Sequence, residues 1–208
     1  MEPQRIVLAS GNAGKLREIQ AVLAEQSCEL IKQSEFNVPE ADETGLTFVE
    51  NAIIKARNAC EHTKLPSIAD DSGIEVDALN GAPGIYSARY AGIPSDDSAN
   101  NQKLLQALEN VPENQRSARF QCVIVFMRHS EDPTPLICTG SWEGRILREA
   151  NGKNGFGYDP LFWVPTHECA SAELPPEEKN RISHRGQALR QLAAGAQSFL
   201  HTLSPTLS

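Results

Sequence analysis

The stretch that decides the fold class is residues 5–32, RIVLASGNAGKLREIQAVLAEQSCELIK. It opens with a short apolar run at residues 5–9, which predicts a buried strand. Apolar residues then recur at helical spacing from Leu16 to Leu23, and residues 29–32 return to strand character. A strand, a helix and a second strand in this order favour a parallel crossover, in which both strands join one sheet. The chain therefore opens as an α/β protein.

The rest of the chain alternates helix and strand signals and then turns to longer strands. Thr47 and Glu50 form a capping-box signal for a helix with small residues on its apolar face. Residues 119–128 and 136–147 predict two long strands that can pair as a hairpin. Ser183 is a good N-cap for a final amphipathic helix. We therefore expect a mixed α/β domain with a central mixed β-sheet.

Length and charge exclude several classes of function. The chain has 208 residues, which suits one domain whose core needs no disulfide or metal. Lys and Arg total 19 against 27 Asp and Glu, so the net charge is −8. This charge argues against a protein that binds nucleic-acid polymers and against a polybasic membrane-surface protein. A small polyanionic substrate stays compatible, because a local basic cluster or a metal can reverse the sign of the potential inside a site.

Targeting signals and cysteine usage point to the cytoplasm. The longest apolar run, residues 122–127, is far too short to span a bilayer, and the first residues do not resemble a secretory signal. The five cysteines are scattered and contain no C-x-x-C pair. We therefore expect thiols in a reducing compartment and no membrane association.

The segment Ser10-Gly-Asn-Ala-Gly-Lys15 joins the first strand to the first helix. Glycines let backbone amides approach an anion, a helix N-terminus favours negative charge, and Lys15 adds a positive charge. A Walker motif is excluded, because Leu16 follows the lysine and the glycine spacing is too short. The segment is either a phosphate-binding loop or an ordinary strand-to-helix turn with a solvated lysine.

Carboxylates gather at two places. Residues 67–70 predict a short strand that ends in Asp70-Asp71-Ser72-Gly73, before a second, half-exposed strand at residues 74–79. Asp42 and Glu43 lie in an acidic loop. Carboxylates at a strand end or on a loop can hold Mg²⁺, which usually takes one or two protein carboxylates and keeps several waters. The alternative is a set of solvated loop acids.

Two further segments carry binding chemistry. Phe156 lies between two glycines, so its loop can present the ring for stacking on a planar base, or the ring can anchor the loop. His184 and Arg185 fall in the first turn of the predicted last helix, with Lys179 nearby. Positive side chains there oppose the helix dipole, so stability does not explain them well. They either bind a ligand or are surface charge.

Taken together and in this order, these segments resemble the inosine triphosphate pyrophosphatase family, and more narrowly its bacterial dITP/XTP pyrophosphatases. The resemblance runs from about residue 5 to about residue 200. It is carried by Ser10-Gly-Asn-Ala-Gly-Lys15, Glu43-Thr-Gly45, Phe48-Val-Glu-Asn-Ala52, Lys55-Ala56, Ala69-Asp-Asp-Ser-Gly73, Gly81-Ala-Pro-Gly84, Tyr86-Ser-Ala-Arg89, Gly155-Phe-Gly-Tyr-Asp-Pro160, Glu178-Lys179 and Ser183-His-Arg185.

The resemblance implies a Mg²⁺-dependent homodimer that hydrolyses aberrant purine nucleoside triphosphates to the monophosphate and pyrophosphate. It also implies an elongated, two-lobed domain over residues 1–203, with a central mixed β-sheet flanked by helices and the active-site cleft between the lobes. Residues 204–208 are expected to form a frayed tail. The alternatives are a pyrophosphatase for other modified nucleotides, a nucleotide-binding protein without catalysis, and a structural protein whose motifs are only turns.

Carried over by position, the resemblance assigns a role to each motif residue. Asp71 is the expected catalytic residue, as general base or as a ligand of the metal, and Asp42 or Glu43 completes the metal site. The base, with its oxygen at C6, is expected to meet cationic donors such as Arg185. The residues expected to bind substrate are Ser10, Gly11, Asn12, Ala13, Gly14, Lys15, Lys55, Ser72, Phe156, Gly157, Tyr158, Asp159, Lys179, His184 and Arg185.

Overall fold

The structure, a computed structural model, describes residues 3–10, 13–24 and 28–201. The strands are β1 (Gln4–Leu8), β2 (Cys28–Lys32), β3 (Ser67–Val76), β4 (Ser117–Met127), β5 (Leu136–Ile146), β6 (Phe162–Val164) and β7 (Cys169–Ala170). The α-helices are α1 (Ala13–Val22), α2 (Phe48–Thr63), α3 (Asp97–Ala107), α4 (Pro176–Ile182) and α5 (His184–His201). Among the described helices, none is long and apolar enough to cross a membrane.

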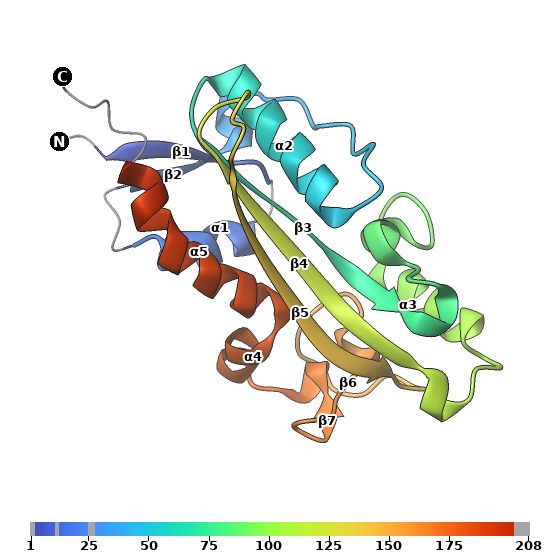
Figure 1. Ribbon diagram of the computed structural model, residues 1–208. Helices are drawn as coiled ribbons and strands as arrows, with labels where there is room; N and C mark the ends of the chain where they lie inside the picture. The colour runs from blue at the N-terminus through green and yellow to red at the C-terminus, as the bar shows by residue number, and fades with distance from the viewer. Residues whose placement is uncertain (1–2, 11–12, 25–27, 202–208) are drawn as a thin grey trace, which may run out of the picture. The chain divides into compact units, whose positions relative to one another are not determined.

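Within these residues, seven strands form one open sheet in the order β2-β1-β3-β4-β5-β6-β7 (Figure 1). β1 pairs in parallel with both β2 and β3, and β6 pairs antiparallel with both β5 and β7. The opening crossover through α1 and the mixed sheet flanked by helices are therefore confirmed, and the protein has an α/β fold.

The chain divides into two compact units. Unit 1 comprises residues 1–71, 123–139 and 188–208, and unit 2 comprises residues 72–122 and 140–187. The expectation of one elongated, two-lobed domain over residues 1–203 with a cleft stays a prediction. Its frayed tail at residues 204–208 lies outside the described residues.

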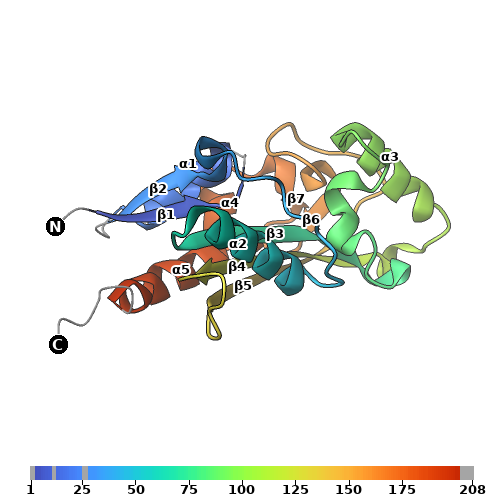
Figure 2. The same cartoon turned by 90° about the horizontal axis from the view of Figure 1, so that it is seen from above.

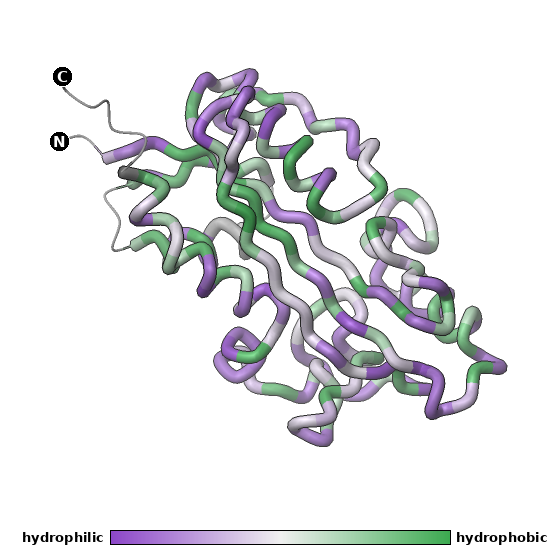
Figure 3. Tube along the Cα trace, in the orientation of Figure 1, coloured by the Kyte–Doolittle hydropathy of each residue, from purple (hydrophilic) through white to green (hydrophobic). Residues whose placement is uncertain are grey.

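In unit 1, helices α2 and α5 lie on opposite faces of the strands, as Figures 1 and 2 show. Strand β4 sends alternate side chains to the two helices, because successive residues of a strand point to opposite faces. Val123, Val125 and Met127 pack with the alanines of α2. Phe126 meets the ring of Phe199 on α5, with ring centroids 4.9 Å apart. Figure 3 shows the hydrophobic run at the end of β4 that results from this double burial.

The start of α2 matches the predicted capping box. The side chain of Thr47 accepts a hydrogen bond from the amide of Glu50 over 3.3 Å, and the Glu50 carboxylate accepts from Thr47 and from the Leu46 amide. These bonds satisfy amides that have no partner inside the helix. The small side chains of Ala52 and Ala56 are fully buried and bring the helix close to the sheet. The sequence therefore predicted correctly where α2 begins and which of its faces is buried.

In unit 2, the sheet has one apolar and one polar face. The apolar face, covered in part by α3, includes Ile74, Phe120 and Trp142. The polar face carries Arg119, whose guanidinium binds Asp77 on one side and Glu143 on the other. Such cross-strand ion pairs are worth little each at an exposed surface, but they mark the register of the strands.

A buried arginine in unit 2 links the end of α3 to the end of β5. Arg116 is 1 % exposed, and its guanidinium donates to the carbonyl oxygens of Leu108, Ile146 and Leu147 over 2.7, 2.8 and 2.9 Å. Leu108 follows α3, whereas the other two residues lie at the end of β5. One side chain therefore fastens the end of α3 to the end of β5.

One sequence expectation is wrong. Residues 67–70 and 74–79 were expected to form two strands separated by a turn at Asp70-Asp71-Ser72-Gly73, but β3 runs unbroken from Ser67 to Val76. These polar residues read as a turn because Asp, Ser and Gly are poor strand formers. In the fold β3 is a strand in the middle of the sheet order, although β1 pairs only with its residues Ser67 and Ile68, and Asp70 and Asp71 are buried. The two aspartates are thus strand residues.

Candidate active site

Two acids and a lysine from separate segments meet in unit 1. The ammonium of Lys55 lies 2.8 Å from Asp71 Oδ1 and 2.9 Å from Glu43 Oε1. Their side chains are 17, 12 and 25 % exposed in the order Lys55, Asp71 and Glu43. We call these three residues the acid–lysine cluster. Bridging by one ammonium holds the two carboxylates close together in a partly dry environment.

Each member of the cluster is placed by a different element. Lys55 projects from α2 and Asp71 from β3, whereas Glu43 lies on the loop before α2. Asn51 holds this loop to the helix, because its Oδ1 accepts the amide of Gly45 over 2.9 Å. A side chain at Gly45 would bring a Cβ within 2.7 Å of that oxygen, so glycine is needed for the close approach.

The electrostatics of the cluster are unbalanced. Burial raises the pKa of Asp71 above its usual range, and the attraction of Lys55 offsets this rise only in part. Burial would lower the pKa of Lys55, but the charges of Asp71 and Asp70 outweigh it and raise the pKa. The lysine therefore stays charged. The positive charge near Asp71 does not fully offset the cost of burying its carboxylate in the charged form.

The donor set of the cluster fits a divalent cation. Among the described residues, Asp71 Oδ2 is fully buried and has no hydrogen-bond partner. A buried oxygen of this kind costs free energy unless something binds it. No group of three or more metal-binding side chains occurs in the described part of the chain. Mg²⁺ is usually held by one or two carboxylates plus waters and substrate phosphates, so Asp71 and Glu43 suffice.

The acidic loop offered two candidates for the metal, and both stay predictions. Glu43 reaches Lys55, whereas Asp42 is exposed on the same loop. The glycine-rich segment is described only in part. Ser10 follows β1 and Ala13, Gly14 and Lys15 begin α1, whereas Gly11 and Asn12 lie outside the described residues.

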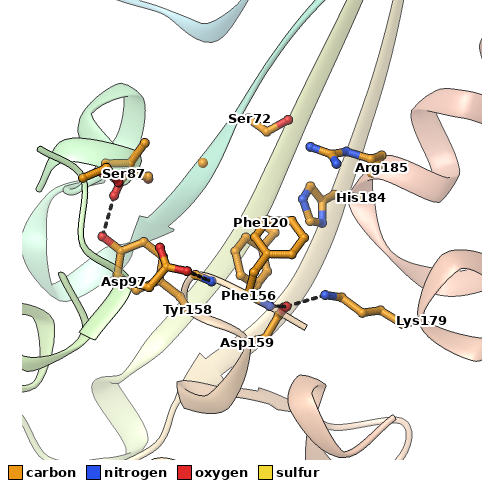
Figure 4. Close-up of a pocket in the computed structure, with 14 residues that line it drawn as sticks. Ser72, Ser87, Asp97, Phe120, Phe156, Tyr158, Asp159, Lys179, His184 and Arg185 are labelled. Atoms are coloured by element: carbon orange, nitrogen blue, oxygen red, sulfur yellow. Dashed lines mark hydrogen bonds and ion pairs between the residues drawn. The ribbon is translucent and has the colours of Figure 1, made fainter. Parts of the chain in front are cut away.

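A pocket of about 160 Å³ lies within unit 2 (Figure 4). This volume is below the roughly 300–1,000 Å³ typical of pockets for drug-sized ligands, so it suits one ring system rather than a whole nucleotide. Ser72 and all the predicted substrate-binding residues from Phe156 onward line it. The lining residues are Ser72, Gly73, Ser87, Ala88, Ser95, Asp97, Phe120, Phe156, Gly157, Tyr158, Asp159, Lys179, His184 and Arg185.

The loop that carries Phe156 is anchored at the two residues that follow it, Gly157 and Tyr158. The Gly157 amide donates to Asp97 over 2.7 Å, and the Gly157 carbonyl accepts from Asn101 over 2.8 Å. The hydroxyl of Tyr158 donates to the carbonyl of Ser87 over 2.8 Å, and burial raises the pKa of this tyrosine. The backbone is thus fixed while the Phe156 ring stays 66 % exposed, so it is free to stack on a base.

Asp159 organises the floor of this loop. Its carboxylate accepts from the Ser171 hydroxyl over 2.9 Å and from the Phe156 amide over 2.8 Å, and it forms an ion pair with Lys179. Gly155 has a φ of +79°, and a Cβ there would lie 2.1 Å from Asp159 Oδ2. Both oxygens of Asp159 are therefore engaged within the protein, which makes it an orienting group for Lys179.

Cationic and aromatic groups meet on one side of the pocket. Figure 4 shows Lys179, His184 and Arg185 reaching into it from the same side. The Lys179 ammonium lies 5.1 Å from the Phe156 ring centroid. The His184 ring stacks on Phe120, with centroids 4.8 Å apart and planes 10° apart. Ser183 caps α5 as expected, accepting the Gly186 amide over 3.2 Å, and so fixes the direction of the first turn.

Several residues of the two sites were not among the predicted site residues, and three of them illustrate why. Phe120 lies on a strand that reads as ordinary core, and Asp97 reads only as the start of a helix. Asn51 was quoted only within the motif Phe48-Val-Glu-Asn-Ala52, yet it is fully buried. The sequence indicates its role in holding the loop only through an amide side chain at a position on the buried face of the helix. The role also depends on where the preceding glycine-containing loop lies, which the sequence does not give.

The sequence pattern of the Ham1 family matches residues 6–195. A dITP/XTP pyrophosphatase of Vibrio cholerae is 62 % identical over 189 residues, which cover 91 % of this chain and 94 % of that protein. A dITP/XTP pyrophosphatase of Thioalkalivibrio sulfidiphilus is 64 % identical over 188 residues, covering 90 % and 96 %.

A solved structure agrees with these relatives. A HAM1 protein from Coxiella burnetii is 56 % identical and superposes with a TM-score of 0.91, covering 94 % of this chain and 99 % of that one. The match in sequence and in fold extends over both units. The chain belongs to the Ham1 family.

Proposed function

We propose that this protein hydrolyses non-canonical purine nucleoside triphosphates, of the dITP and XTP kind, to the monophosphate and pyrophosphate, with Mg²⁺ as its metal. The observation that carries the proposal is the acid–lysine cluster, in which a buried carboxylate oxygen of Asp71 has no partner among the described residues. The activity in the names of the Vibrio and Thioalkalivibrio relatives supports the substrate class.

The acid–lysine cluster supplies the groups that hydrolysis requires. Asp71 and Glu43 would hold the metal, which when bound would lower the pKa of water and neutralise phosphate charge. Asp71 receives the proton of the attacking water, whose oxygen forms a bond to the α-phosphorus. The bond from the α-phosphorus to the bridging oxygen breaks, and pyrophosphate leaves. Lys55, with Lys15 at the start of α1, neutralises the charge that develops on the leaving group.

The pocket in unit 2 receives the base. Phe156 stacks on the purine ring, and Ser72 contacts the substrate at the pocket wall. Hypoxanthine and xanthine carry an acceptor oxygen at C6, where adenine carries an amino donor. The cations Arg185 and Lys179 match the oxygen and leave an amino group mispaired. A site built on such hydrogen bonds discriminates by about 10⁴-fold. Guanine shares the C6 oxygen, so its rejection needs a second contact.

The proposal is tested by measuring pyrophosphate release from ITP, XTP, GTP and ATP, with and without Mg²⁺. We expect release from ITP and XTP, loss of release without the metal, and kcat/KM for ATP lower by about 10²–10⁴-fold. Binding of nucleotide without release of pyrophosphate would favour a nucleotide sensor. Preference for a modified pyrimidine would favour a different pyrophosphatase, and failure to bind any nucleotide would favour a structural role.

Arg185→Ala tests base selection. We expect the ratio of kcat/KM for ITP over ATP to fall by about 10–100-fold, because a charged hydrogen bond to the C6 oxygen is lost. Arg190→Ala, on the next turn of α5 but outside the pocket, is the control and keeps the ratio of the wild type. An unchanged ratio in a folded Arg185→Ala variant would remove Arg185 from base selection.

We further propose that the protein acts in the cytoplasm as a homodimer. All five cysteines are free thiols, which suits a reducing compartment. The resemblance to the pyrophosphatase family supports the homodimer, which sedimentation of the purified protein measures directly.

A further inference from the structure

The ammonium of Lys55 occupies the place that a cation would take between the carboxylates of the acid–lysine cluster. It contacts Asp71 Oδ1 and Glu43 Oε1 at 2.8 and 2.9 Å, so one oxygen of each acid is already engaged. A Mg²⁺ ion demands oxygens at about 2.0–2.1 Å in near-octahedral geometry. The ion and the ammonium therefore cannot hold the same two oxygens at once. An ion on Asp71 Oδ2 would lie close beside the ammonium, whose like charge opposes its binding.

The cluster is also built so that the ammonium can leave. Lys55 is anchored on α2, whereas its charged head sits on a flexible four-carbon stem. The carboxylates come from elements with their own support: Asp71 lies in the middle of β3, and Asn51 ties the Glu43 loop to the helix. The acids can therefore stay in place when the ammonium moves.

The free-energy cost of moving the Lys55 ammonium depends on which anions surround it afterwards. If a metal enters alone, the ammonium loses two close carboxylates and gains no new anion, which is unfavourable in a partly buried site. If a metal enters with a polyphosphate, the ammonium can move onto a phosphate oxygen. Metal and polyphosphate binding are then coupled, and by linkage each must strengthen the other.

We propose that Lys55 acts as a resident counter-ion that suppresses binding of a divalent cation alone and makes loading of the metal depend on the polyphosphate. This inference rests on the proposed function in one respect, that Glu43 and Asp71 hold the metal. In this role Lys55 positions the carboxylates of Asp71 and Glu43 before the metal binds. This role is additional to its proposed contact with the leaving group.

The test is calorimetric titration of Mg²⁺, or Mn²⁺ where the heat is small, into the protein without nucleotide in a mildly alkaline buffer. We expect Lys55→Met to bind the metal alone at least about fivefold more tightly than the wild type. Lys32→Met removes an equal charge on β2 in the same unit and keeps wild-type affinity. Lys55→Gln, which keeps a neutral donor, serves as the second variant if circular dichroism shows that Lys55→Met does not fold.

The same titration in the presence of inorganic triphosphate measures the coupling. In the wild type the metal should bind far more tightly with triphosphate than without it, and in Lys55→Met this gain should shrink. Equal or weaker metal binding in both Lys55 variants overturns the inference. Pyrophosphate release by the wild type keeps the two proposals apart: an active wild type with no tightening in the variants overturns this inference alone, whereas an inactive wild type overturns the proposed function.

Discussion

Asp71→Asn lowers kcat for the triphosphate substrate by about 10²–10⁴-fold while the protein stays folded, if Asp71 acts as proposed. The amide has the shape of the carboxylate, so the packing of β3 is kept. It cannot accept the proton of the attacking water, and it removes the negative charge opposite Lys55. Since burial already raises the pKa of Asp71, the loss of charge relieves a cost in the folded state, and stability should not fall.

The measurement is pyrophosphate release at saturating substrate, with thermal unfolding recorded on the same samples. Asp77→Asn is the matched control, because Asp77 is exposed and binds Arg119 on the polar face of unit 2. It should leave kcat unchanged. A folded Asp71→Asn variant with kcat close to that of the wild type would exclude Asp71 from the chemical step.

Arg116→Met is expected to lower the free energy of unfolding by about 3–5 kcal/mol, the largest loss of stability that we expect from one substitution. The variant keeps much of the buried volume but removes every donor of the guanidinium. The carbonyl oxygens of Leu108, Ile146 and Leu147 then lose a donor, whereas that of Leu108 keeps the Val111 amide. Each unsatisfied buried acceptor costs about 1–3 kcal/mol. Arg116→Lys should lose most of the same energy, because one ammonium cannot reproduce the planar fork.

Urea unfolding followed by fluorescence measures this loss. Arg148→Met is the control: Arg148 is 55 % exposed and its ion pair with Glu113 spans 3.4 Å, so the loss should stay below about 1 kcal/mol. A change of less than about 1 kcal/mol in Arg116→Met would show that water replaces the guanidinium at the three carbonyls.

Much of the fold could be predicted because its signals are local. The capping box at Thr47, the N-cap at Ser183 and the apolar spacing of α1 each depend on residues within one or two turns. The turn predicted at Asp70-Asp71-Ser72-Gly73 is wrong because distant residues decide the structure there. The propensity of Asp, Ser and Gly for turns is weak compared with the pairing of β3 within the sheet, and its partner strands lie elsewhere in the sequence.

The two sites were predicted through motifs, but their internal arrangement was not. The sequence placed Asp159 among the substrate-binding residues, which stays a prediction, but it did not indicate the contacts of Asp159 with Ser171, Phe156 and Lys179. Likewise, the stacking of His184 on Phe120 joins residues that are distant in the chain. Neither contact leaves a periodic or compositional trace, because each depends on which face of a strand or loop meets which helix.

Strand β4 shows what the alternation of its two faces means for the evolution of the protein. Arg119 binds Asp77 and Glu143 on the polar side, while Phe120, one residue later, lines the pocket on the other. Single substitutions alter one position and leave its neighbours where they are. An insertion or deletion of one residue exchanges the two sides at every later position, turning the pocket wall outward and the ion pairs inward. We therefore expect a change in the length of β4 to harm the fold more than a replacement of any one of its residues.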